Sequence, residues 1–274
     1  MPFAIYNGNL IDESQANISI KNQGYFFDFA VYDSLKTVQG KIFFPEYHVD
    51  RLIESAQLMD LGHSFTKEQI LNWLELLVTK NQTADALLRI VLIGDVDKNQ
   101  DAQLYIIQVT GLTYYPNTYY SQGVKVITYH GERSLPQCKS KNLLLGFLAL
   151  REAKKRGAIE ALLIDHDGNI REGSRSNFFA IKGDTIISPP TVKILSGITR
   201  KILLGVTAGH FKIEEKDIAL NTIKNYDELF ITSTSQNVLP IRQIDEVEIA
   251  SSFPQTKKLQ KLFKEYYQKN VLKI

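Results

Sequence analysis

The chain has 274 residues, of which 44% are apolar and 23% charged, the composition of a globular protein with enough material for a core. Its formal net charge of +2 gives no electrostatic argument for binding nucleic acid or an anionic membrane surface. The single cysteine excludes an internal disulfide, and we see neither a basic and apolar leader nor an apolar run long enough to span a bilayer. We therefore expect a cytoplasmic protein.

The first 110 residues are predicted to form strands, then helices, then strands. Residues 3–11 favour a hairpin that turns at Asn7-Gly8, and the strand-like residues 24–45 turn again at Gln39-Gly40. Residues 46–61 and 67–80 both repeat apolar side chains at i, i+3, i+4 and i+7, the period of a helix with one buried face. Residues 86–93 and 104–110 are rich in β-formers. This order indicates an α+β layer rather than a βαβ series.

A change of pattern at residues 111–122 predicts two domains. This segment is rich in Tyr, Asn and Thr, contains a proline and has no period. We therefore divide the chain into a first domain at 1–112, a linker at 113–122 and a second domain at 123–274. The second domain is predicted to contain strands at 124–128, 160–165, 177–187 and 227–232, and helices at 142–156, from Thr199, and at 256–272.

Lys139 lies just before the predicted helix 142–156. Leu143, Phe147 and Leu150 recur at i, i+4 and i+7, so we expect them to form a buried face that holds the lysine at the lip of a packed element. A lysine in such a place can act as a nucleophilic amine. Taken alone, however, the pattern favours an ordinary solvated lysine.

Two polar segments are candidate anion sites. Gly197, Ile198 and Thr199 stand where a helix begins, and the free N–H groups of a helix N-terminus attract anions. Ser233 and Thr234 belong to a run of four hydroxyl residues that follows a predicted strand. Each segment also fits a plain helix cap or a polar turn.

Two charged residues complete the pattern. Arg51, in a predicted helix, could fix a phosphate, although most helical arginines are surface residues. Glu172, beside Gly173 and between two predicted strands, suggests a partly buried acid with a partner. Together with Lys139 and the two anion sites, these residues suit a ligand with a carbonyl, an anionic group and a basic ring nitrogen. Pyridoxal phosphate has these three features.

The order of these motifs resembles the fold-type-IV pyridoxal-phosphate enzymes, which include branched-chain aminotransferases, D-amino acid aminotransferases and aminodeoxychorismate lyase. The resemblance spans nearly the whole chain, in the segments GYFFDFAVYDSLK, HVDRLIESA, KSKN with LREAKKRGAIEALLID, GNIREGSRSNFFAI, ILSGITR and DELFITSTSQNVLPI. It implies an α+β fold with a small N-terminal α/β sandwich, a larger C-terminal barrel-like α/β domain, and pyridoxal phosphate bound between them.

The resemblance also implies roles for individual residues. Lys139 matches the lysine that binds the cofactor covalently and moves the substrate proton, and Glu172 matches the acid that pairs with the pyridine nitrogen. Arg51 matches the phosphate-binding arginine of the H-x-x-R-L motif. The remaining matches are Leu195 against the ring, Gly197, Ile198 and Thr199 in one phosphate loop, Ser233 and Thr234 in the other, and Tyr32 as an active-site tyrosine.

The substrate is less clearly indicated. D-amino acid enzymes clamp the substrate carboxylate with an Arg-x-His pair, but Lys98-Asn99-Gln100 stands at that place here, and lysine lacks the fork of arginine. Arg89 resembles an arginine of the branched-chain enzymes and fits a surface charge at a strand end equally well. Arg175 is a candidate for contacting an acidic substrate group, or it points to solvent.

We expect a transaminase for L-branched-chain or related amino acids with a 2-oxo acid such as 2-oxoglutarate. A D-amino acid transaminase is the second alternative, and 4-amino-4-deoxychorismate lyase is the third, although the lyase's E-C-C-type continuation is absent here. An inactive scaffold on the same fold is disfavoured because Lys139, Arg51 and Glu172 are all present. The resemblance implies a homodimer, and we expect no metal site.

Overall fold

The computed structural model describes residues 2–94, 102–109, 112 and 114–272. The chain forms two compact units. Unit 1 consists of residues 1–113, 138–142 and 271–274, and unit 2 consists of residues 114–137 and 143–270. Residues 138–142, which the sequence-based division placed in the second domain, thus belong to unit 1.

Unit 1 is built on an antiparallel sheet, whose strands in the described residues follow the order β2-β1-β6-β5-β3-β4. The first hairpin turns at Asn7 and Gly8, both with positive φ, as the Asn-Gly pair predicted. The second turns at Gln39 and Gly40 in the same way. The strands are β1 (Phe3–Tyr6), β2 (Asn9–Asp12), β3 (Ala30–Val38), β4 (Lys41–Ile42), β5 (Ala86–Ile93) and β6 (Gln103–Val109).

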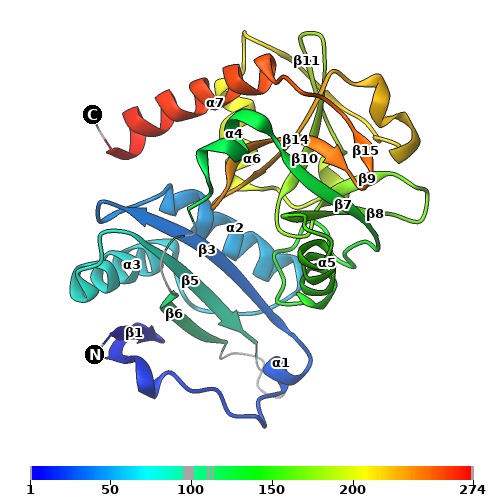
Figure 1. Cartoon of the computed structure of the whole chain (residues 1–274). Helices are drawn as coiled ribbons and strands as arrows, with labels where there is room; N and C mark the ends of the chain where they lie inside the picture. The colour runs from blue at the N-terminus through cyan, green and yellow to red at the C-terminus, as the bar shows by residue number, and fades with distance from the viewer. Residues whose placement is uncertain (1, 95–101, 110–111, 113, 273–274) are drawn as a thin grey trace. The chain divides into compact units, whose positions relative to one another are not determined.

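Two long helices, α2 (Pro45–Leu58) and α3 (Lys67–Asn81), form the core of unit 1 with this sheet. Both were predicted from their apolar period. The blue to teal part of Figure 1 shows these elements. Leu52 of α2 and Leu74 of α3 are fully buried together with Leu35 and Leu88 of the sheet. The short helix α1 (Gln23–Phe26) lies where the sequence predicted a strand, and Asn22 caps it by accepting a hydrogen bond from the Tyr25 amide.

Unit 2 is built on a sheet that closes into a barrel. Strands β10, β13, β14, β7, β8 and β9 pair in that order, and β9 pairs again with β10 through Glu172 and Asn177. The strands are β7 (Val124–His130), β8 (Glu160–Ile164), β9 (Ile170–Gly173), β10 (Asn177–Lys182), β11 (Thr185–Ser188), β12 (Lys212–Glu215), β13 (Glu228–Ser233), β14 (Asn237–Ile244) and β15 (Val247–Glu248). This barrel-like architecture agrees with the expected C-terminal domain. Figure 1 shows its strands from green through orange.

The helices of unit 2 are α4 (Asn117–Gln122), α5 (Leu144–Lys155), α6 (Ile198–Val206) and α7 (Pro254–Tyr267). The predicted buried face of α5 is wrong, because Leu143 is 46% exposed and Phe147 is 60% exposed. The buried residues of α5 are Ala149 and Ala153, which pack with apolar side chains of β7 and β8. Small side chains let the helix approach the barrel closely, so the larger apolar residues remain outside.

Helix α4 lies within the predicted linker 113–122. Two further local predictions were wrong. The predicted strand 177–187 is two strands joined at Gly183, whose φ of 58° makes the turn. The polar segment that holds Glu172 contains a strand of its own, β9. None of the helices in the described part of the chain combines the length and apolar character that a membrane span needs.

Candidate active site

Lys139 lies in a short extended segment along β3 in unit 1. Its carbonyl accepts a hydrogen bond from the Tyr32 amide (3.0 Å), and the Lys141 amide donates to the Ala30 carbonyl (2.8 Å). The Lys139 amide donates to the hydroxyl of Ser55 on α2 (3.0 Å). The half-buried side chain places its ammonium 4.8 Å from the centroid of the Tyr32 ring. The lysine is therefore held by β3 and α2, rather than by the buried helix face that the sequence suggested.

Arg51 belongs to a buried network with Asp33 and His48. Its Nε and one terminal nitrogen each donate to a different oxygen of the fully buried Asp33 carboxylate, both at 2.8 Å. His48 Nδ1 lies 2.7 Å from Asp33 Oδ1. The sequence reasoning missed Asp33 and His48. The signal was available, because Asp33 alternates with the buried Val31 and Leu35 on one face of β3.

The charges of this network explain its protonation states. Burial alone would raise the pKa of Asp33, but the Arg51 guanidinium and His48 hold that pKa well below its ordinary value. Burial lowers the pKa of His48, opposed by Asp33 and reinforced by the positive charges of Arg51 and Lys139. Asp33 is thus ionised and can only accept, so His48 Nδ1 carries the proton. Arg51 is held as an oriented cation, and the charge of Lys139 acts on the neighbouring His48.

Tyr32 and Arg89 share the opposite face of the unit 1 sheet. Arg89 of β5 is paired in register with Ser34 of β3, and Tyr32 is two residues along that strand. The Arg89 guanidinium lies 6.0 Å from the centroid of the Tyr32 ring. Its Nε atom is buried and has no hydrogen-bond partner in the described part of the chain. Lys98, another substrate-binding candidate from the sequence, lies outside the described residues.

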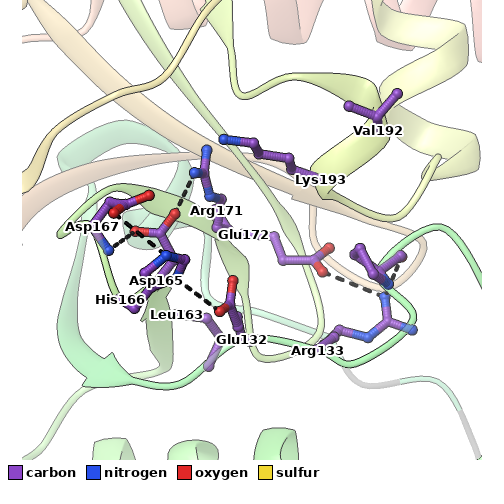
Figure 2. Close-up of a pocket in the computed structure, with 11 residues that line it drawn as sticks. Glu132, Arg133, Leu163, Asp165, His166, Asp167, Arg171, Glu172, Val192 and Lys193 are labelled. Carbon is purple, nitrogen blue, oxygen red and sulfur yellow. Dashed lines mark hydrogen bonds and ion pairs between the residues drawn. The ribbon is translucent and has the colours of Figure 1, made fainter.

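Glu172 of β9 lies in unit 2 and is 5% exposed. One carboxylate oxygen lies 3.4 Å from an Arg133 terminal nitrogen, and the other accepts from the Leu195 amide (3.2 Å). Figure 2 shows the Glu172 carboxylate pointing toward Arg133, and both residues line a cavity of about 160 Å³. Glu172 is therefore the partly buried, partnered acid that the sequence suggested. Arg133 was missed because nothing in its local pattern marks it.

Closure of the barrel brings the other unit 2 candidates to Glu172. Asn177 of β10 is in register with both Glu172 and Thr232 of β13. Its side-chain amide donates to the Leu195 carbonyl (2.8 Å), while its Oδ1 would lie 2.0 Å from a Cβ placed on Gly197. Glycine is thus required at position 197 by close approach. The barrel therefore gathers Glu172, Leu195 and Gly197 around one asparagine.

The two candidate anion-binding segments follow from these residues. Helix α6 starts directly after Gly197 without a side-chain cap, so its first N–H groups point out of the helix. Thr199 in its first turn is 2% exposed, and its hydroxyl has no hydrogen-bond partner within the described residues. Because a buried hydroxyl without a partner is costly, this atom indicates a missing acceptor or donor.

The second element is the turn from β13 to β14, which contains the predicted Ser233 and Thr234. Ser233 Oγ donates to Gln236 Oε1 (3.0 Å) and accepts from the Gln236 amide (3.2 Å). The Thr232 hydroxyl and Gln236 Nε2 are buried without hydrogen-bond partners among the residues described. Gln236 escaped the sequence analysis, whereas Thr232 belongs to the run of four hydroxyl residues that it identified.

Arg175 lies three residues after Glu172 and contacts Tyr115 and Glu160. Its guanidinium donates to the Tyr115 hydroxyl (3.2 Å) and lies 3.9 Å from the Glu160 carboxylate. Glu160 is fully buried and accepts hydrogen bonds from the Ser174 amide and from the hydroxyls of Ser174 and Ser176. The buried carboxylate thus fixes the turn that follows Glu172.

These groups fit pyridoxal phosphate. The cofactor offers an aldehyde, a basic ring nitrogen and a phosphate. Unit 1 carries an amine on Lys139 and an oriented guanidinium on Arg51, and unit 2 carries the Glu172 carboxylate and the unpartnered Thr199 hydroxyl at a helix N-terminus. Each of these three functional groups of the cofactor therefore has a chemically matching group in the protein. Groups of three or more possible metal ligands are absent from the residues described.

The family model for amino-transferase class IV matches residues 30–244. This chain belongs to the class IV aminotransferases. It is 34% identical to the D-alanine aminotransferase of Bacillus licheniformis, over 91% of both chains. It is 31% identical to the branched-chain-amino-acid aminotransferase of Pseudomonas aeruginosa, over 94% of this chain and 90% of that one. The protein is thus a pyridoxal-phosphate-dependent aminotransferase, as its motifs predicted.

Solved structures confirm the fold. The branched-chain amino acid aminotransferase of Escherichia coli superposes with a TM-score of 0.89 at 20% identity, covering 97% of this chain and 94% of that chain. The branched-chain aminotransferase of Thermoproteus uzoniensis, solved with norvaline, superposes with a TM-score of 0.86 at 22% identity and the same coverage. A further branched-chain enzyme, solved with pyridoxamine 5'-phosphate, gives a TM-score of 0.88 at 21% identity. At such identities the likeness establishes the fold-type-IV architecture alone. The relatives include both branched-chain and D-alanine enzymes, so the family assignment leaves the substrate open.

Proposed function

We propose that this class IV aminotransferase transfers the amino group of an L-branched-chain or related amino acid to a 2-oxo acid such as 2-oxoglutarate. The observation that carries this proposal is Arg89. Its planar guanidinium lies beside Tyr32 on one sheet face, and its buried Nε has no hydrogen-bond partner among the described residues. A guanidinium in this state is suited to a carboxylate, which it binds through paired N–H groups.

The proposed roles of the cofactor residues follow from their surroundings. Pyridoxal phosphate, when bound, supplies the carbonyl that reacts with an amino group and a ring that accepts electrons. Arg51, Gly197, Ile198, Thr199, Ser233 and Thr234 hold the phosphate, and Leu195 packs on the ring. Arg51 needs no reorientation because Asp33 already fixes its guanidinium. A preorganised cation binds a phosphate at a smaller cost in side-chain entropy.

Two residues carry the chemistry in this proposal. Lys139 Nζ would hold the cofactor and, once the substrate amine has displaced it, would take the proton from the substrate Cα as a general base. The Glu172 carboxylate stabilises a proton on the ring nitrogen by opposite charge, which keeps the ring a good acceptor of electrons. The Leu195 amide and Arg133 hold this carboxylate in place. Tyr32, Arg89, Lys98 and Arg175 are proposed to contact the substrate.

A D-amino acid transaminase is the second candidate. Several relatives at 30–34% identity are D-alanine aminotransferases. Their substrate would be recognised here without the Arg-x-His pair, since Lys98-Asn99-Gln100 takes its place in the sequence. 4-Amino-4-deoxychorismate lyase activity is the third. We also propose that the protein is a homodimer, which light scattering on the purified protein would test.

A half-reaction titration tests the proposed substrate. The protein is loaded with pyridoxal phosphate, and the absorbance of the bound cofactor is followed while single amino acids are added without an acceptor. We expect L-Leu and L-Glu to bleach this absorbance and D-Ala to leave it unchanged. Bleaching by D-Ala or D-Glu instead would establish the second candidate, and a response to neither stereoisomer would favour the lyase.

Matched variants separate cofactor attachment from general effects of charge. Lys139→Ala should abolish the absorbance of attached cofactor. Lys141→Ala removes a lysine two residues away that pairs with Asp28, and should keep this absorbance. If Lys139→Ala matches the wild type, the assignment of the lysine is wrong.

A further inference from the structure

Helix α2 carries two polar residues one turn apart. Arg51 and Ser55 are at i and i+4, so they lie on the same face of the helix. Both are buried, with exposures of 7% and 1%. Arg51 reaches the Asp33 carboxylate of β3, and Ser55 reaches the segment that carries Lys139. Helix α2 therefore carries Arg51 and also binds the backbone of Lys139 through Ser55, the two residues of unit 1 that we propose for the cofactor being Arg51 and Lys139.

Ser55 contacts the lysine segment through two atoms. Its hydroxyl oxygen accepts the Lys139 amide hydrogen at 3.0 Å, and its backbone carbonyl accepts from the Cys138 thiol at 3.4 Å. On its other side the segment is hydrogen-bonded to β3 through the Lys139 carbonyl and the Lys141 amide. Lys139 is thus fixed between a strand and a helix by separate hydrogen bonds to its N–H and its C=O.

The identity of residue 55 is not explained by helix formation. Its neighbours on the buried side of α2 include Leu52 and Ala56, which only pack. Serine forms helices less readily than alanine, and alanine would also fit a buried position next to another small residue. Alanine would, however, leave the Lys139 amide without this acceptor, and an unsatisfied buried donor is costly. The Ser55 hydroxyl therefore stabilises the backbone at Lys139 and does not contribute to the formation of the helix.

We propose that Ser55 is a positioning residue, which fixes the backbone of Lys139 relative to Arg51. The inference rests on the proposed function, in which Lys139 reacts with the cofactor whose phosphate Arg51 binds. A reacting amine must be placed accurately, and a displacement of about 1 Å can cost on the order of 100-fold in rate. Loss of the Ser55 hydroxyl should accordingly slow reactions of the lysine while leaving phosphate binding intact.

Hydrogen exchange on the protein without added cofactor tests the contact itself. In Ser55→Ala the Lys139 amide should exchange about 10-fold faster, because one hydrogen bond is lost. The Lys141 amide, which donates to Ala30, should change much less. Thr66→Ala is the matched control, since it removes the N-cap of α3 in the same unit and lowers stability without touching Lys139.

Attachment kinetics test the role. The rate at which cofactor absorbance develops should fall on the order of 10- to 100-fold in Ser55→Ala, for pyridoxal phosphate and for unphosphorylated pyridoxal alike. Ser55→Thr, which keeps the hydroxyl, should restore most of the rate. A defect in phosphate binding would instead affect only the phosphorylated aldehyde, as expected for substitutions of Arg51.

The outcomes are distinguishable. Equal Lys139 exchange in Ser55→Ala and wild type would overturn the inference, as would an attachment rate that falls no further than in Thr66→Ala. Failure of the proposed role of Lys139 has another signature, because Lys139→Ala would then attach the cofactor as the wild type does. That result would overturn the role of Ser55 toward the cofactor even if the exchange effect were present.

Discussion

Replacing Asp33 by asparagine would leave the buried Arg51 guanidinium without its carboxylate. Asparagine has nearly the same shape, so the substitution opens no cavity, but it removes the negative charge and replaces one accepting oxygen by an amide nitrogen that cannot accept. Asp33 is fully buried and accepts hydrogen bonds at 2.7–2.8 Å from two Arg51 nitrogens, from His48 and from the Ser34 amide. The substitution therefore removes the charge and one acceptor of a buried carboxylate without changing its packing.

The expected cost follows from the burial of the pair. Hydrogen bonds to a charged group contribute about 1.5–3 kcal/mol each, partly offset by the cost of burying the carboxylate. Removing one partner of a buried ion pair typically destabilises by about 3–5 kcal/mol, because the remaining charge is uncompensated. We expect Asp33→Asn to lose this amount of the free energy of unfolding, a large part of the stability of a typical domain.

Urea unfolding without added cofactor measures the effect, with Asp50→Asn as the control. Asp50 is on the same helix as Arg51 and pairs with Lys67, but both side chains are about 40% exposed, so its loss should cost below about 1 kcal/mol. The pKa of Asp33 is lowered from 3.8, so its contribution is present above that pH and is lost as the pH falls through the lower folded value. The difference in the free energy of unfolding between Asp33→Asn and wild type should thus stay constant from pH 8 to 5 and shrink only below about pH 4. A loss no larger than that of Asp50→Asn would refute the reasoning.

Three other predictions concern single side chains. Thr199→Val should weaken pyridoxal phosphate binding about 10-fold but leave pyridoxal binding unchanged. Because the Thr199 hydroxyl has no partner among the described residues, the substitution should not lower the free energy of unfolding in the absence of cofactor. Equal affinity of variant and wild type for pyridoxal phosphate would exclude a phosphate contact. Glu172→Gln should reduce turnover on the order of 100-fold with little change in cofactor affinity, whereas Arg51→Lys should mainly lower the affinity for the cofactor. The reverse pattern would contradict the assigned roles. Burial lowers the pKa of Lys36 from 10.5 to about 8, so its charge costs about 3 kcal/mol below pH 8, a cost that disappears as the pH rises to 10.5. Lys36→Met should therefore be more stable than wild type at pH 7, by a margin that narrows at pH 9.5, and a constant margin would contradict the assignment.

The sequence determined much of the local structure. The helices α2 and α3 follow from their apolar period, and the hairpins at Asn7-Gly8 and Gln39-Gly40 follow from residues that adopt positive φ at little cost. The ordered motifs around Arg51, Lys139, Glu172 and Thr199 identified the family, and with it the fold and the pyridoxal-phosphate chemistry. These signals are local, so they can be read without knowing which segments meet.

Tertiary structure decided the features that depend on contacts between segments distant in sequence. The buried face of α5 was misjudged, because the side that packs is chosen by how closely alanines let the helix approach the barrel. Asp33, His48, Ser55 and Arg133 were missed, because each matters only through a partner distant in sequence. Residues 138–142 pair with β3 across more than 100 positions, and the barrel closes where Glu172 meets Asn177. Local patterns set which residues can carry the chemistry, and long-range pairing alone sets their orientation, because hydrogen bonds and burial act between neighbours in space.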